Sequence, residues 1–99
     1  MNILKRTRTC LNWFLHLDDM EAKNRIIRRV DRAEGGNFGD HCALGDGVSE
    51  MRIDYGPGYR IYFAREGHTI YLLLLGGDKR TQDKDIVKAK AIWQAIKGK

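Results

Sequence analysis

Apolar residues recur at helical spacing over the first third of the chain. A threonine at position 7 or 9 can cap a first helix, whose apolar side continues through residues 10–17. Asp18, followed three residues later by Glu21, indicates the start of a second helix, and glycines at 35 and 36 end it. Both helices are amphipathic, so we expect them to run antiparallel and to cover one face of a sheet.

Strand periodicity replaces helical periodicity after residue 40. Glycine-rich turns separate short runs of strand character, and the last run is apolar enough for a central strand buried on both faces. The predicted strands are residues 1–5, 41–44, 48–54, 59–63 and 70–75. Thr81 can cap a last helix whose apolar positions are Ile86, Ala89, Trp93 and Ile96. The pattern predicts one α+β domain over residues 1–99, with two N-terminal helices and a C-terminal helix on a mainly antiparallel sheet of three to five strands.

Two arginines lie in the strands that flank a glycine-proline-glycine turn. In the second of these strands Arg60 and Tyr62 point to one face, while Tyr59 points to the other. If the hairpin register aligns the polar faces, Arg52 joins Arg60 and Tyr62 in one patch, with Glu50 nearby. An arginine among apolar strand residues is costly without a partner. The patch is therefore a candidate site for a negatively charged ligand.

The charge of the chain is unevenly distributed. The net charge of +5 divides into about +3 for residues 1–34, −3 for 35–78 and +5 for 79–99. This distribution suggests a polyanion or an acidic protein as partner. Cys10 and Cys42 fit no metal or redox spacing, so we expect free thiols and neither metal nor cofactor. The sequence predicts no membrane span and no signal peptide, and we expect a cytoplasmic protein.

Several segments, in the same order and spread over nearly the whole chain, are typical of one protein family. They are Trp13-Phe14-Leu15, Ala22-Lys23-Asn24-Arg25-Ile26, Gly36-Asn37-Phe38-Gly39-Asp40, Gly47-Val48-Ser49-Glu50-Met51-Arg52-Ile53, Gly56-Pro57-Gly58-Tyr59-Arg60-Ile61-Tyr62-Phe63, and Gly76-Gly77-Asp78-Lys79 with Gln82, Asp85 and Ile86. With these segments the chain resembles the RelE/ParE superfamily of toxins from bacterial toxin–antitoxin modules. The similarity is greatest to the HigB-like branch, the addiction-module killer proteins. The resemblance implies a RelE-like fold for the single domain.

The resemblance implies a type II toxin that arrests translation by cutting mRNA on the ribosome. In this chemistry the 2′-hydroxyl of the RNA attacks the adjacent phosphate without a metal, and it needs a base, cations and a proton donor. Arg60 matches a phosphate-stabilising arginine of the family, and Arg52 falls where RelE members carry a basic residue that helps proton transfer. Lys79 and Arg80 match basic residues after the last strand. The expected catalytic residues are thus Arg52, Arg60 and Lys79, and the expected RNA-binding residues are Arg80, Tyr59 and Tyr62.

The chain departs from the RelE pattern in its C-terminal segment, where RelE has a tyrosine and this chain has Asp85 and Ile86. Arginine remains protonated and is a poor general base. Tyr62, Asp78, Asp85 and His68 stay open as groups that could move a proton. The departure also keeps two alternatives open: a ParE-like toxin that inhibits DNA gyrase without chemistry, and a degenerate toxin that only binds its antitoxin.

The family also implies a cognate antitoxin, in this branch a small helix-turn-helix protein that binds DNA. The second predicted helix carries Arg25, Arg28 and Arg32 away from its apolar stripe. We expect these arginines to bind acidic residues of the antitoxin, because exposed opposite charges accelerate association.

Overall fold

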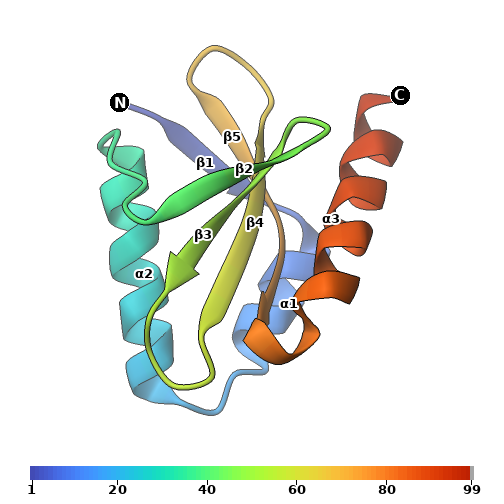
Figure 1. Cartoon of the computed structure of the whole chain (residues 1–99). Coiled ribbons are helices and arrows are strands. Elements are labelled where there is room, and N and C mark those ends of the chain that lie inside the picture. Colours follow the sequence, from blue (N-terminus) through green and yellow to red (C-terminus); the bar gives the residue numbers. More distant parts are fainter. Residues whose placement is uncertain (99) are drawn as a thin grey trace.

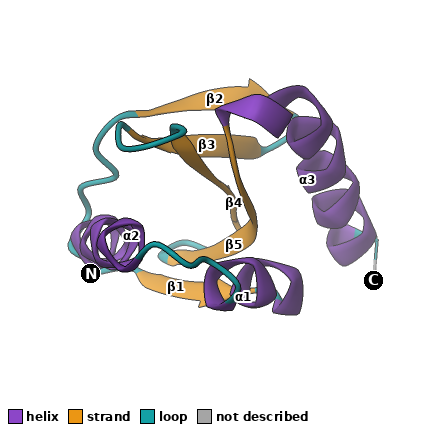
Figure 2. Cartoon of the chain, turned by 90° about the horizontal axis from the view of Figure 1, so that it is seen from below, coloured by secondary structure: helices purple, strands orange, loops and turns teal. Residues whose placement is uncertain are grey.

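A twisted five-stranded sheet separates two N-terminal helices from a single C-terminal helix (Figures 1 and 2). The computed structural model describes residues 1–98. The elements follow in the order β1 (Ile3–Arg6), α1 (Arg8–Leu15), α2 (Met20–Glu34), β2 (His41–Gly45), β3 (Val48–Ile53), β4 (Tyr59–Arg65), β5 (Ile70–Asp78), a 3₁₀ turn η1 (Lys79–Thr81) and α3 (Gln82–Lys97). The predicted α+β architecture is confirmed. No helix within residues 1–98 is long and apolar enough to span a membrane.

The strand order across the sheet is β1-β5-β4-β3-β2. β1 runs parallel to β5, and the other three pairings are antiparallel. The middle strand is therefore β4, not the 70–75 run, although β5 has strands on both sides and its leucines are buried as predicted. β5 also continues to Asp78, because its two glycines extend the ladder with β4 instead of ending it.

The helix starts are partly as predicted. Thr7 caps α1 by accepting a hydrogen bond from the Cys10 amide at 3.0 Å. The cap of α2 is Asp19 and not Asp18, and its Oδ1 accepts from two amides of the first turn at 2.9 and 3.2 Å. Thr81 occupies the cap position of α3 without a capping bond, because its hydroxyl donates to Asp85 at 2.6 Å.

The core has two halves, one on each face of the sheet. The half under α1 and α2 contains Cys10, Ala22, Ile26, Ala33, Met51, Ile53, Tyr59, Ile61, Phe63 and Leu73. The half under α3 contains Val48, Tyr62, Ala64, Leu72, Leu74, Leu75, Ala89 and Trp93. Side chains of β4 point alternately into the two halves of the core, as the strand periodicity predicts.

The expected antiparallel packing of α1 and α2 is wrong. Figure 2 views α2 nearly along its axis, whereas α1 lies across the view. Each helix packs mainly on the sheet, α1 on β5 and α2 on β1. The sheet, not a helix hairpin, therefore determines where the two helices lie.

Candidate functional site

Arg52 and Arg60 lie directly opposite each other on β3 and β4. The next rung of the ladder pairs Glu50 with Tyr62, so the predicted polar patch is present on the sheet. On the far side of Arg60 its partner in β5 is Gly77. These side chains share the face that carries α3, while Tyr62 forms part of the core beneath that helix. Like charges directly opposite in a sheet repel, so the arginine pair requires nearby anions.

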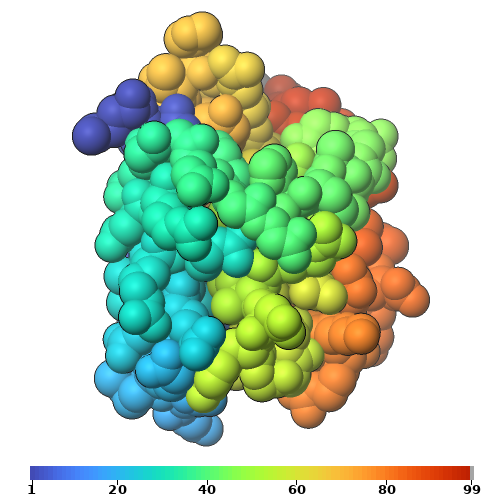
Figure 3. Space-filling view, turned by 60° about the vertical axis from the view of Figure 1, so that its left-hand side comes forward, coloured from blue at the N-terminus to red at the C-terminus, as the bar shows by residue number. Residues whose placement is uncertain are grey.

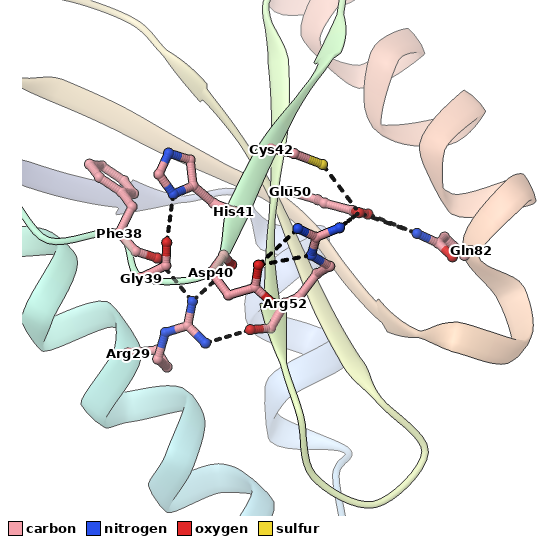
Figure 4. A network of polar contacts seen from close by, with 9 residues as sticks. All are labelled: Arg29, Phe38, Gly39, Asp40, His41, Cys42, Glu50, Arg52 and Gln82. Carbon is pink, nitrogen blue, oxygen red and sulfur yellow. Dashed lines mark hydrogen bonds and ion pairs between the residues drawn. The ribbon is translucent and has the colours of Figure 1, made fainter.

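Asp40 binds the guanidinium of Arg52 from the loop before β2. Its Oδ1 accepts from Arg52 Nη2 at 2.8 Å and from Arg52 Nε at 3.2 Å (Figure 4). This hydrogen-bonded ion pair lowers the pKa of Asp40 and raises the pKa of Arg52. The pair is largely exposed, with side-chain exposures of 36% for Arg52 and 62% for Asp40. One edge of the Arg52 guanidinium is thus already occupied by a carboxylate.

Glu50 is a buried carboxylate beside this pair, with only 2% of its surface exposed. Gln82 of α3 donates to its two oxygens at 3.1 and 3.3 Å, and the Cys42 thiol donates at 3.7 Å (Figure 4). Arg52 Nη1 lies 4.0 Å from Glu50 Oε2. A buried charge is tolerated when it is paired and hydrogen-bonded. Glu50 therefore offsets the arginine charges and joins the start of α3 to β3.

Arg60 and Tyr62 contain polar atoms that are buried without a protein partner. Arg60 Nε and the Tyr62 hydroxyl have no hydrogen-bond partner among residues 1–98. Burial raises the pKa of Tyr62, and the carboxylates of Glu50 and Asp85 raise it further, so the phenol stays protonated. Buried donors are nearly always satisfied in proteins. The unused hydrogen-bond donor at Arg60 Nε is therefore the feature of this site that most favours an external anion.

Among the predicted acid–base candidates, Asp85 lies beside the arginine pair. A Cβ atom at Gly77 would come within 2.1 Å of Asp85 Oδ2, so the bare glycine lets this carboxylate approach the sheet next to Arg60. Asp78 instead pairs with Arg80 at 2.9 Å, which lowers the pKa of Asp78. His68 lies in the turn after β4, at the opposite end of that strand from Arg60.

The other predicted site residues are either exposed in the turn after β5 or buried in the core. Lys79 and Arg80 are exposed in η1, where the Lys79 amide donates to the Pro57 carbonyl at 3.4 Å. Tyr59 faces α1, is 7% exposed and contacts Trp13 edge to face at 6.3 Å. Tyr62 is fully buried. Neither tyrosine therefore offers an open ring for stacking on a base in this structure.

The three arginines predicted to bind an antitoxin are exposed on α2. Figure 3 shows that α2 (cyan) and the start of α3 (orange) lie on either side of the β3–β4 region (yellow-green). Arg25 and Arg28 both pair with Glu21, at 2.9 and 3.3 Å. The α2 arginines thus form a surface that is separate from the sheet arginines.

Arg29 of α2 is a structural residue that was not among the predicted site residues. Its guanidinium donates to the carbonyls of Arg52, Phe38 (2.9 Å) and Asp40 (3.1 Å) (Figure 4). Gly39 has a positive φ of 64°, which favours glycine, and a Cβ there would lie 2.8 Å from Arg29 Nη2. The spacing from Ile26 to position 29 places Arg29 on the buried stripe of α2, and this signal could have identified it. Arg29 fixes the loop that presents Asp40 to Arg52.

The site thus combines two guanidiniums with carboxylates from three different elements. Such a set can bind an anion and move a proton. Residues 1–98 contain no group of histidine, cysteine and acidic side chains arranged to hold a metal ion. Both cysteine thiols are free, and Cys10 is buried.

The fold and the site define a small α+β protein with a cationic site on its sheet. A protein of Haemophilus influenzae, described as an uncharacterized protein, is 44% identical over 93 residues, or 94% of each chain. The chain belongs to the same family as that protein. No protein-family model matches the chain, and no solved structure matches it.

Proposed function

We propose that the protein is the toxin of a type II toxin–antitoxin module and that it cuts mRNA on the ribosome. The observation that carries this proposal is the arginine pair, in which Arg60 Nε is buried without a protein partner. Two adjacent guanidiniums suit a phosphate that gains charge in its transition state. The RelE-like order of segments along the chain supports the same reading.

In the proposed reaction the 2′-oxygen of one nucleotide bonds to the adjacent phosphorus while the bond to the next 5′-oxygen breaks. Arg60 and Arg52 stabilise the charge on the phosphate oxygens. Asp85 accepts the proton of the 2′-hydroxyl, because it is a carboxylate beside Arg60, whereas the neighbouring Tyr62 phenol stays protonated. The leaving 5′-oxygen takes up a proton from water, and the products are a 2′,3′-cyclic phosphate and a 5′-hydroxyl.

One observation favours the ParE-like alternative, in which the protein inhibits DNA gyrase without cutting RNA. Tyr59 and Tyr62 are both buried, so neither ring is open to stack on a base. Expression in cells separates the two functions. The endonuclease predicts a rapid stop of translation and new mRNA 5′ ends, whereas gyrase inhibition predicts intact transcripts and accumulating double-strand DNA breaks.

The proposed function includes a cognate antitoxin, and the exposed arginines of α2 are its proposed docking surface. This surface lies apart from the arginine pair on the sheet. An antitoxin bound there would block access to the ribosome without filling the catalytic site.

A further inference from the structure

Two carboxylates on the side of the sheet that carries Arg60 are each held by an uncharged donor. Gln82 donates to both oxygens of Glu50, at 3.1 and 3.3 Å. The hydroxyl of Thr81 donates to Asp85 Oδ2 at 2.6 Å. No ion pair joins Arg60 to a carboxylate within residues 1–98. The nearby carboxylates therefore leave this arginine unpaired.

The Thr81 side chain does not fulfil the usual role of a threonine at a helix start. Thr81 occupies the cap position of α3, where a threonine side chain commonly accepts a hydrogen bond from an amide of the first turn. No such bond forms. The 2.6 Å contact with Asp85 instead has the length of a charge-assisted bond from a hydroxyl to a carboxylate. The hydroxyl therefore holds the carboxylate and not the end of the helix.

Asp85 lies close enough to Arg60 to pair with it. Gly77 is directly opposite Arg60 in the β4–β5 ladder, and Cβ atoms at such positions are about 5 Å apart. Asp85 Oδ2 would lie only 2.1 Å from a Cβ at Gly77, and Thr81 Oγ1 would lie 3.5 Å from it. Arg60 Nε is buried without a protein partner. A rotation of the half-buried Asp85 side chain is therefore enough to bring the two charges together.

We propose that Thr81 is a positioning residue that keeps Asp85 from pairing with Arg60 and so leaves the guanidinium open to a phosphate. The inference rests on the proposed function, in which Arg60 binds the phosphate. Without the hydroxyl, Asp85 loses its donor, and the unpaired cation beside it is Arg60. A phosphate must then break an ion pair before it binds, because carboxylate and phosphate oxygens compete for the same guanidinium donors.

Removing the hydroxyl should therefore weaken phosphate binding only while Asp85 is charged. Thr81→Val keeps the shape of the side chain, and we expect the affinity of the Arg60 site for inorganic phosphate to fall about fivefold, the upper value of an exposed ion pair. Thr81→Ser keeps the hydroxyl and should bind phosphate as wild type does. In an Asp85→Asn background no carboxylate remains to pair with Arg60, so Thr81→Val should have no effect on phosphate affinity.

The test titrates inorganic phosphate into the full-length chain and follows the Nε–Hε NMR signal of Arg60, assigned by its loss in Arg60→Lys. Thr69→Val is the matched control, because it makes the same change at an exposed threonine just before β5, at the opposite end of that strand from Gly77. Circular dichroism checks that each variant is folded. Thr81→Ala replaces Thr81→Val should the valine variant unfold.

The proposal requires a loss of affinity in Thr81→Val that is absent from Thr81→Ser and Thr69→Val and that disappears in the Asp85→Asn background. A loss of equal size in that background would assign the effect to the start of α3 and overturn the proposal. Undiminished affinity in Thr81→Val, or an Arg60 signal that phosphate does not move in wild type, would overturn it as well. Cleavage of ribosome-bound mRNA by wild type is measured on the same preparation. Intact mRNA would refute the endonuclease, whereas the phosphate titrations alone decide the role of Thr81.

Discussion

Gly76 and Gly77 leave opposite faces of β5 bare for two different side chains. A Cβ at Gly76 would meet three ring atoms of Trp13 at 2.0 to 2.3 Å, on the side covered by α1. A Cβ at Gly77 would meet Asp85 Oδ2 at 2.1 Å, on the side covered by α3. Alanine at position 76 therefore tests the packing under α1, and alanine at position 77 tests the packing under α3.

The two substitutions should lower the folding stability by different amounts. In Gly76→Ala a rigid indole must move, and overpacking of this kind costs about 3 kcal/mol, which lowers Tm by on the order of 15 °C for a domain of this size. In Gly77→Ala the Asp85 side chain can rotate away, at the cost of its 2.6 Å bond from Thr81. That loss is about 1 kcal/mol, and the lower chain entropy of alanine offsets part of it.

Urea unfolding followed by circular dichroism measures both effects. Gly67→Ala is the control, because its Cβ would meet only Ile70 atoms at 3.5 Å or more. We expect Gly76→Ala to be by far the least stable variant. Gly77→Ala should stay folded and lose RNA cleavage, since Asp85 leaves Arg60. A Gly76→Ala variant whose stability lies within about 0.5 kcal/mol of wild type, or a Gly77→Ala variant as unstable as Gly76→Ala, would contradict this expectation.

Three further predictions concern cations and a buried thiol. Arg60→Ala should abolish growth arrest while the protein stays folded, whereas Arg65→Ala on the same strand should still arrest growth; an Arg60→Ala strain that arrests at wild-type expression contradicts the assignment. Reversing Arg28 and Arg32 to glutamate should weaken the antitoxin complex more than folding, and added salt should slow association of the wild type, because exposed charges are screened; binding insensitive to both changes would remove α2 as the docking surface. Burial raises the pKa of Cys10 from 9.0 to about 11. The contribution of the protonated thiol to the free energy of unfolding is therefore complete below pH 9 and is lost as pH rises through 11. Between these pH values, urea unfolding should show a smaller loss of stability for Cys10→Ala than for wild type.

Much of the fold could be predicted because local patterns and burial agree. The two-residue period of β4 placed Arg60 and Tyr62 on one face, whereas their register with Arg52 and Glu50 stayed conditional and is given by the structure. The order of strands across the sheet was harder to predict from the sequence. The pairing of β1 with β5 joins residues 67 positions apart, and no local signal specifies it. For the same reason the 70–75 run was wrongly expected at the centre.

In the candidate site, too, local patterns could be predicted and long-range contacts could not. The arginine pair followed from strand periodicity, whereas the contacts that control it come from distant elements. Gln82 reaches Glu50 from α3, and Asp40 reaches Arg52 from a loop that Arg29 holds. These contacts depend on how helices pack on the sheet, which the sequence pattern does not specify.

In the proposed function the arginine pair catalyses metal-independent cleavage of mRNA on the ribosome. The most direct measurement adds purified protein to ribosomes stalled on a defined mRNA and determines the fragments and the chemistry of their 5′ ends. We expect 5′-hydroxyl fragments with wild type, and cleavage about a hundredfold slower with Arg60→Ala or Arg52→Ala. Intact mRNA, fragments with 5′-phosphate ends, or undiminished cleavage by the Arg60→Ala variant would contradict it.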